Sequence, residues 1–213
     1  MLLKIYALLL KKFGNQYWWP VQGKNKELEI SLGAILTQST SWKNVEKAIK
    51  NLINNGLLDK DKLSKISSRQ LASLIKSSGY YNQKAKKIKN FIKFLQTNDF
   101  EELRAMSISD ARKKLLGVNG VGEETADSIL LYALNKPIFV IDAYTKRIFS
   151  RVLEKNFNFY GGWQKFFHAN LPKDARLFNE YHALLVALGK DFCRKKPLCG
   201  ECPISQFCST SHF

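Results

Sequence analysis

Residues 115–151 combine a glycine-rich turn with a single carboxylate that follows an apolar run. The turn contains Gly117, Gly120 and Gly122, and the carboxylate is Asp142. A turn that points several backbone N–H groups at one oxyanion needs left-handed or crowded backbone, which glycine permits. Gly122 also precedes a predicted helix, whose first turn has unpaired N–H donors. The pattern predicts a phosphate site, although glycines that merely cap two helices are the alternative.

Asp142 has two interpretations. A lone carboxylate can stabilise a positive charge that develops during a reaction. Aspartate is also among the best N-cap residues, and an amphipathic helix containing Tyr144 and Ile148 follows it. Both roles remain open from the residues alone.

Four cysteines near the C-terminus have the spacing of a metal site. They are separated as C-x5-C-x2-C-x5-C, at positions Cys193, Cys199, Cys202 and Cys208. Two disulfides within one short tail would connect nothing distant in the chain. Zinc sites usually show two close cysteine pairs, whereas this chain has one. The spacing therefore does not favour zinc, which stays an alternative.

Composition indicates a folded protein with a polyanionic partner. The 213 residues are 45% hydrophobic and carry a formal net charge of +16. Such a charge favours nucleic acid, with an anionic membrane surface as the alternative. No run approaches the roughly 20 apolar residues of a spanning helix. Lys4 interrupts the apolar N-terminal segment, which predicts an amphipathic helix rather than a signal peptide.

Apolar residues recur with helical spacing along most of the chain, which predicts an all-α fold. Val45, Ala48, Ile49 and Leu52 form one such stripe. Ser67 or Ser68 can cap a helix that ends before Gly79. The apolar residues 137–141 could form a short strand.

The turn and the aspartate resemble the helix-hairpin-helix of the endonuclease III superfamily of DNA glycosylases. Residues 118–126 match its L-P-G-V-G-x-K-T-A pattern, and Ile141-Asp142 matches the V-D that follows. The cysteine spacing resembles the family's C-x6-C-x2-C-x5-C loop, with a first interval that is one residue shorter. The resemblance implies a 4Fe-4S cluster at residues 193–208, held by Cys193, Cys199, Cys202 and Cys208.

The same resemblance implies two lobes. A helical barrel lobe spans residues 28–134 and includes the hairpin, and residues 1–27 and 135–213 form the other lobe. Double-stranded DNA with a damaged base would lie in the groove between the lobes. Backbone N–H groups of Val118, Gly120, Val121 and Gly122 would bind phosphate, and hairpin carbonyls could hold a monovalent cation.

Glu124 stands where bifunctional members of the superfamily have a Schiff-base lysine. A carboxylate cannot attack the sugar as an amine does, so the resemblance implies a monofunctional enzyme that uses water, with Asp142 as its catalytic residue. Glu124 either faces a cationic base or is only an acid in a first helical turn, where the dipole favours it.

Two further segments resemble the bacterial 3-methyladenine DNA glycosylases of this superfamily. They are Y-W-W-P at residues 17–20 and L-G-A-I-L-T-Q-S-T-S-W-K-N-V at residues 32–45. The resemblance implies that Trp18 and Trp42 sandwich the base, with Trp19 and Pro20 as the adjacent wall. Hydrophobic packing of these rings is the alternative.

Gln38 corresponds to the glutamine that fills the space left by the flipped nucleotide. Lys84, in G-Y-Y-N-Q-K-A, is assigned to phosphate. His168, His182 and His212 show no zinc or triad spacing, so no catalytic role is predicted for them.

The predicted function is release of an alkylated purine, 3-methyladenine, from DNA by a monomeric cytoplasmic or nucleoid-associated enzyme. The alternatives are a bifunctional glycosylase and lyase acting on oxidised pyrimidines, and a non-catalytic DNA-binding iron-sulfur protein.

Overall fold

The computed structural model describes residues 1–210, and none of these residues forms a β-strand. The predicted all-α fold is therefore confirmed. The α-helices are α1 (Leu2–Phe13), α2 (Lys26–Leu36), α3 (Trp42–Asn54), α4 (Lys60–Lys65), α5 (Ser68–Leu74), α6 (Tyr81–Leu95), α7 (Phe100–Ala105), α8 (Ile108–Leu116), α9 (Glu123–Ser128), α10 (Ala143–Leu153), α11 (Tyr160–Asn170) and α12 (Ala175–Asp191). Short helical turns are η1 (Lys76–Ser78), η3 (Cys199–Glu201) and η4 (Ser205–Phe207), and η2 (Ile129–Ala133) is a π-helical segment that continues α9.

The chain divides into two compact units. Residues 1–18 and 137–213 form one, here called the terminal unit, and residues 19–136 form the other, the inserted unit. The sequence analysis places these divisions at residues 27 and 134. Residues 19–27, which include Trp19 and Pro20, therefore belong to the inserted unit.

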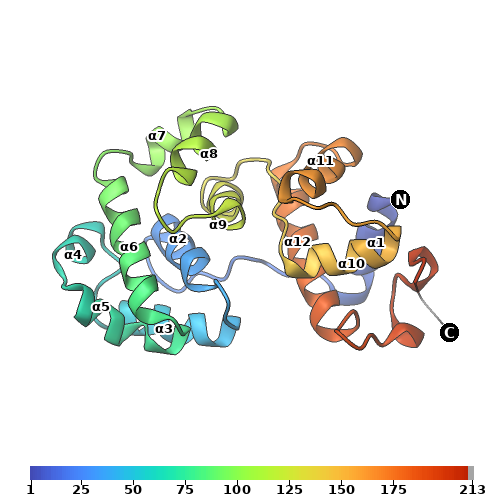
Figure 1. Cartoon of the computed structure of the whole chain (residues 1–213), viewed down its shortest axis with the longest axis horizontal. Helices are drawn as coiled ribbons and strands as arrows, with labels where there is room; N and C mark the ends of the chain where they lie inside the picture. The colour runs from blue at the N-terminus through green and yellow to red at the C-terminus, as the bar shows by residue number, and fades with distance from the viewer. Residues whose placement is uncertain (211–213) are drawn as a thin grey trace. The chain divides into compact units, whose positions relative to one another are not determined.

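The inserted unit is built around α2, which packs against α3, α6, α9 and η2 (Figure 1). Residues 28–36 of α2 are all buried. Helix α6 also packs against α4 and α5. A capping box begins α5, because the Ser67 hydroxyl accepts from the Gln70 N–H while the Gln70 side chain accepts from the Ser67 N–H.

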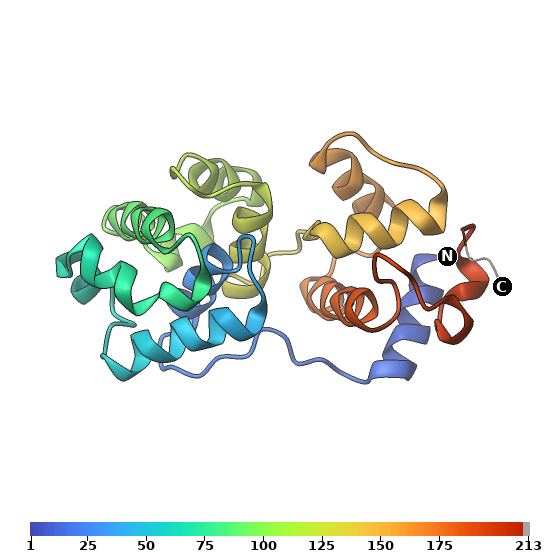
Figure 2. The ribbon, with the colours of Figure 1, turned by 60° about the horizontal axis from the view of Figure 1, so that its bottom comes forward.

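The terminal unit is built around α12, which packs against α1 and α10 (Figure 2). The Tyr181 hydroxyl, on α12, donates to the Leu2 carbonyl of α1. In its core, Phe139 stacks on Phe167 and meets Phe178 edge-on. Residues 137–141 form neither helix nor strand, so the short strand considered for them is absent. Among the described residues, no helix is long and apolar enough to cross a membrane.

Candidate functional site

In the turn between α8 and α9, only one glycine combines a positive φ with a crowded Cβ position. Gly120 has φ +99°, and a Cβ there would lie 2.3 Å from Cγ of Lys87. Gly117 has helical backbone, and Gly122 is nearly extended, with φ −94° and ψ −179°. The prediction that all three glycines serve left-handed or crowded backbone is therefore wrong for Gly122, whose added Cβ would meet no atom within 4 Å.

The hairpin N–H groups differ in their availability. The N–H of Val118 donates to Leu115, and that of Val121 donates to Val118. Both valine side chains are buried and anchor the turn. Within residues 1–210, the N–H groups of Gly120 and Gly122 donate to no acceptor. The N–H groups of Val118 and Val121 are therefore used within the turn, whereas those of Gly120 and Gly122 could donate to a ligand such as phosphate.

Gln38 is bound to the hairpin. Its Nε2 lies 3.1 Å from the Gly120 carbonyl and 3.0 Å from Oγ1 of Thr125. Its Oε1 accepts from Nζ of Lys87. Ser39, the next residue, is exposed and has φ +55°. Entry of the Gln38 side chain into DNA would require these hydrogen bonds to be exchanged.

Lys84 is a structural residue. It is 2% exposed, and its ammonium group donates to the Leu36 carbonyl at 2.8 Å and the Ser78 carbonyl at 2.6 Å. Burial, together with the nearby charge of Lys87, lowers its pKa to about 8. The assignment of Lys84 to phosphate is wrong, because its donors close the ends of α2 and η1 instead.

Sequence analysis missed Tyr80. Its ring is 68% exposed, and its backbone is left-handed, with φ +43°, just before α6. Lys84 joins the ends of α2 and η1, so the Tyr80 turn lies next to the segment that carries Gln38. The residue type gave no signal, because tyrosine suits a core equally well. The strained backbone and the exposed side chain together mark Tyr80 as a functional candidate.

Three aromatic rings gather on α2 of the inserted unit. Trp19 meets Trp42 edge-on at 5.0 Å between centroids, and it lies 5.2 Å from Tyr132. Gly33 permits this contact, because a Cβ there would lie 2.8 Å from the Trp19 ring. Tyr132 comes from the π-helical segment η2, a geometry frequent at functional sites.

The base sandwich between Trp18 and Trp42, with Trp19 and Pro20 as the adjacent wall, stays a prediction. In the structure Trp19 packs directly on Trp42. Trp18 belongs to the terminal unit, and Pro20 is exposed in the inserted unit. Glu124 is exposed in the first turn of α9.

Asp142 begins α10 as its N-cap. Its Oδ1 accepts from the Thr145 N–H at 2.7 Å, and the residue is 9% exposed. Its other oxygen, Oδ2, lies 3.7 Å from Nε2 of His182 on α12. Burial lowers the pKa of His182, and the Asp142 carboxylate opposes that effect in part.

Sequence analysis considered His182 and gave it no role, and its contact with Asp142 was not foreseen because the two residues lie far apart along the chain. His168 has a structural role, because its Nε2 accepts from the Phe139 N–H at 3.0 Å and its ring stacks on Phe178. His212 lies outside the described residues.

The four cysteines line one pocket of the terminal unit, together with residues of α10 and α12. None forms a disulfide. Burial raises the pKa of the Cys202 thiol, and the other three cysteines raise it further, so each of the three lies within electrostatic reach of Cys202. Among the described residues, no three histidine, cysteine or acidic side chains form a group that could hold one metal ion.

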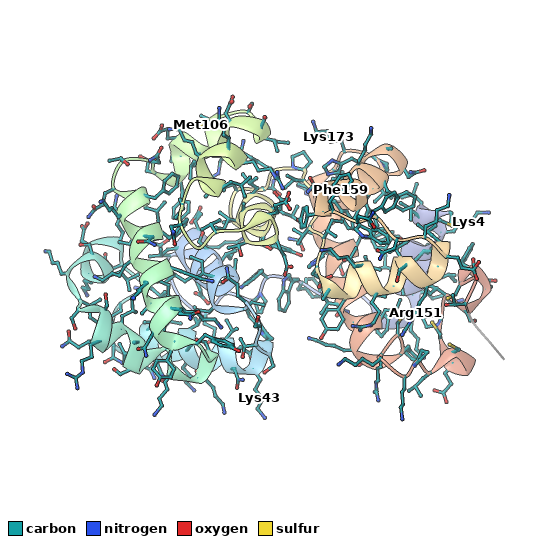
Figure 3. The ribbon with its side chains drawn as sticks, in the orientation of Figure 1. Lys4, Lys43, Met106, Arg151, Phe159 and Lys173 are labelled. Carbon is teal, nitrogen blue, oxygen red and sulfur yellow. The ribbon has the colours of Figure 1, made fainter. Side chains whose placement is uncertain are left out.

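Arginines of α10 hold the cysteine segment in place. Arg147 donates to the carbonyls of Gly189 and Cys193. Arg151 is labelled in Figure 3. It donates to Sγ of Cys193 at 3.1 Å and to the carbonyls of Arg194 and Lys195. Four clustered thiols beside a fixed cation suit a metal-sulfur group that carries net negative charge.

Comparison with known proteins identifies the family. Residues 32–156 match the HhH-GPD superfamily base excision DNA repair protein, and residues 194–208 match the iron-sulfur binding domain of endonuclease III. The chain therefore belongs to the HhH-GPD superfamily and is a DNA glycosylase of the base excision repair type. The predicted recognition is confirmed.

Relatives align over most of the chain. A Methanocaldococcus jannaschii protein named "putative DNA repair glycosylase" is 49% identical over 98% of this chain and 96% of its own length. Endonuclease III of Thermotoga maritima is 29% identical over 84% of this chain and 81% of its own.

Solved structures agree with the fold. The structure of H. pylori 3-methyladenine DNA glycosylase bound to 1,N6-ethenoadenine has a TM-score of 0.76 and 28% identity, covering 89% of this chain and 95% of that chain. A trapped endonuclease III-DNA covalent intermediate has a TM-score of 0.81 and 19% identity, covering 98% and 96%, and shows the fold alone.

Proposed function

We propose that this DNA glycosylase binds double-stranded DNA, flips an alkylated purine and releases it by hydrolysis without cutting the strand. The observation that carries the proposal is the carboxylate at position 124, where a lyase of this superfamily would need an amine. The proposed base is 3-methyladenine, whose positive charge a nearby carboxylate would favour.

Asp142 is the proposed catalytic residue. As the glycosidic bond breaks, its electron pair moves to the departing base, which leaves neutral, and positive charge develops on the sugar. The carboxylate stabilises that charge and orients a water molecule, whose oxygen bonds to the anomeric carbon and whose proton passes to the carboxylate or to solvent. Because Oδ1 caps α10, Oδ2 is the oxygen assigned to this work.

The aromatic cluster of Trp19, Trp42 and Tyr132 is the proposed base-binding surface. An extruded base is held mainly by stacking, and a positively charged ring gains further from an aromatic face. The bound ethenoadenine of the H. pylori glycosylase, itself a modified adenine, supports a purine. Trp18, Pro20 and Glu124 stay predicted base-binding residues.

DNA is the proposed partner, held at the hairpin. The N–H groups of Gly120 and Gly122 are the proposed phosphate donors, and the net charge of +16 would supply attraction at longer range. Gln38 and the exposed ring of Tyr80 are the candidates to fill the space that the flipped nucleotide leaves. A monovalent cation at the hairpin carbonyls, a monomeric state and a cytoplasmic location stay predictions.

The cofactor proposed for the cysteine pocket is a 4Fe-4S cluster, with zinc as the alternative. Four thiols that form no disulfide line one pocket and fit such a group, and Arg151 would offset its charge. When bound, the cluster would stabilise the C-terminal loop, which has little core of its own. A brown protein with about four iron atoms per chain would support it, whereas one zinc per chain would replace it.

The decisive test of the function uses duplex DNA methylated with dimethyl sulfate. Released bases are separated by chromatography, and a parallel denaturing gel records strand cuts. We expect free 3-methyladenine, no enzyme-dependent cuts, and loss of release in Asp142→Asn. Covalent trapping of the protein on abasic DNA by borohydride would indicate the lyase instead. If Asp142→Asn matched wild type at a background rate, the protein would be a binding module.

A further inference from the structure

Helices α10 and α12 of the terminal unit pack in close parallel register. A Cβ at Gly189 of α12 would lie 2.3 Å from the Tyr144 ring of α10, so glycine is needed for the approach. Further along, Arg147 binds the carbonyls of Gly189 and Cys193. His182 lies two turns before Gly189 and therefore on the same face of α12. This register brings its imidazole to the start of α10, where Asp142 lies.

The contact between His182 and Asp142 involves Oδ2, the carboxylate oxygen of Asp142 that does not cap α10. Oδ1 of Asp142 accepts from the Thr145 N–H, and Oδ2 lies 3.7 Å from Nε2 of His182. This distance exceeds the usual 3.2 Å or so of a hydrogen bond and leaves no room for a water between the atoms. A small side-chain rotation closes it, as catalytic contacts do when substrate binds.

We propose that His182 is a positioning residue for the glycosylase reaction, holding Oδ2 of Asp142 in its reactive orientation through a neutral Nε2–H group. The inference rests on the proposed function, because it takes Asp142 as the reacting carboxylate. His182 itself touches neither the sugar nor the base.

Burial explains why the neutral imidazole is the working form. His182 is 7% exposed, and desolvation lowers its pKa from the ordinary value of 6.5. A neutral donor orients the carboxylate and leaves its negative charge available to the sugar cation, whereas an imidazolium would offset that charge.

The neighbouring titratable residues of α12, Glu180 and Tyr181, form hydrogen bonds with other parts of the unit. Glu180 accepts from the Gln16 N–H, and the Tyr181 hydroxyl donates to the Leu2 carbonyl. Asp142 is thus the charged group that faces His182 from α10.

The first test measures single-turnover release of 3-methyladenine from dimethyl sulfate-treated DNA. His182→Leu should lower the rate about ten- to hundredfold, since a misplaced catalytic group costs that much, with DNA affinity unchanged. His182→Gln, which keeps an N–H donor, should recover part of the loss. The pKa of His182 lies below 6.5, and in wild type the release rate should fall as the pH drops through it, because the imidazolium offsets the Asp142 charge. His182→Gln cannot be protonated in this way and should lack this fall in rate at low pH, the acid limb of the pH profile.

The second test needs no DNA. NMR titration of the imidazole should show a lower pKa for His182 in Asp142→Asn than in wild type, because the carboxylate favours the imidazolium. His168→Gln is the matched control, since its ring contacts Phe139 and Phe178 and not Asp142. It should leave both the acid limb and the His182 titration unchanged.

The outcomes separate the two proposals. If Asp142→Asn abolishes release while His182→Leu keeps the wild-type rate and acid limb, only the positioning role fails. An unchanged His182 titration in Asp142→Asn also overturns that role. If Asp142→Asn releases the base normally, the proposed function fails whatever His182 does.

Discussion

Arg112 and Asp127 form a two-point ion pair across the hairpin. Nε of Arg112 lies 2.7 Å from Oδ1 of Asp127, and Nη2 lies 3.2 Å from Oδ2. Arg112 belongs to α8 and Asp127 to α9, so the pair joins the two helices that flank Gly120. The Asp127 side chain is fully buried, which makes the pair a fixed brace for the turn.

Removing the arginine of this brace should destabilise the protein. In Arg112→Met, the buried carboxylate of Asp127 loses its bidentate partner, and we expect the free energy of unfolding to fall by about 3 kcal/mol. Urea denaturation measures the change. Lys114→Ala is the control, because its pair with Glu102 is largely exposed and should contribute under about 1 kcal/mol. Equal losses in both variants would contradict the brace.

Two hairpin glycines should separate stability from DNA binding. Gly122→Ala places a methyl group in open space on nearly extended backbone. The free energy of unfolding should therefore change by less than about 0.5 kcal/mol. The methyl would obstruct close approach of a phosphate, and affinity for undamaged duplex DNA should fall several-fold by fluorescence anisotropy.

Gly120→Ala is the matched contrast. Its φ of +99° and the contact with Lys87 should make it destabilising by more than about 1 kcal/mol. Normal DNA affinity in Gly122→Ala would show that phosphate does not approach this glycine.

Lys84 should give the protein a measurable pH dependence in the alkaline range. Its folded pKa of about 8 lies below the ordinary 10.5, so between these values the unfolded chain binds more protons, and stability from this group rises with pH. The free energy of unfolding of wild type relative to Lys84→Met should therefore increase by about 2 kcal/mol from pH 8 to pH 10. Lys86→Met, on the exposed side of α6, is the control. A pH-independent difference for Lys84→Met would refute the buried charge.

Glu124→Lys should introduce lyase character. The change restores the amine that the bifunctional members place in this hairpin, at a solvent-exposed position. Borohydride should trap the variant covalently on abasic DNA above the wild-type background. Glu123→Lys, in the same helical turn, controls for the added positive charge. Equal trapping of both variants would mean that position 124 has no special access to the sugar.

Local structure was predicted well from the sequence. The Ser67 cap, the helix start at Asp142 and the hairpin near Gly120 rest on side-chain chemistry within a few residues. The family and the all-α fold followed as well, because the motif residues are contiguous in the chain. Lys84 was assigned wrongly because a lysine's burial depends on which carbonyls the fold brings to it.

The sequence by itself determined the helical periodicity, the cysteine spacing, the excess positive charge and the carboxylate at position 124, since each is a property of residue type and order. Tertiary structure alone decided that His182 meets Asp142, that Trp19 packs on Trp42 and Tyr132, and that Gln38 binds the hairpin. These contacts join residues far apart in the chain, and helix packing sets their register, which no local pattern encodes.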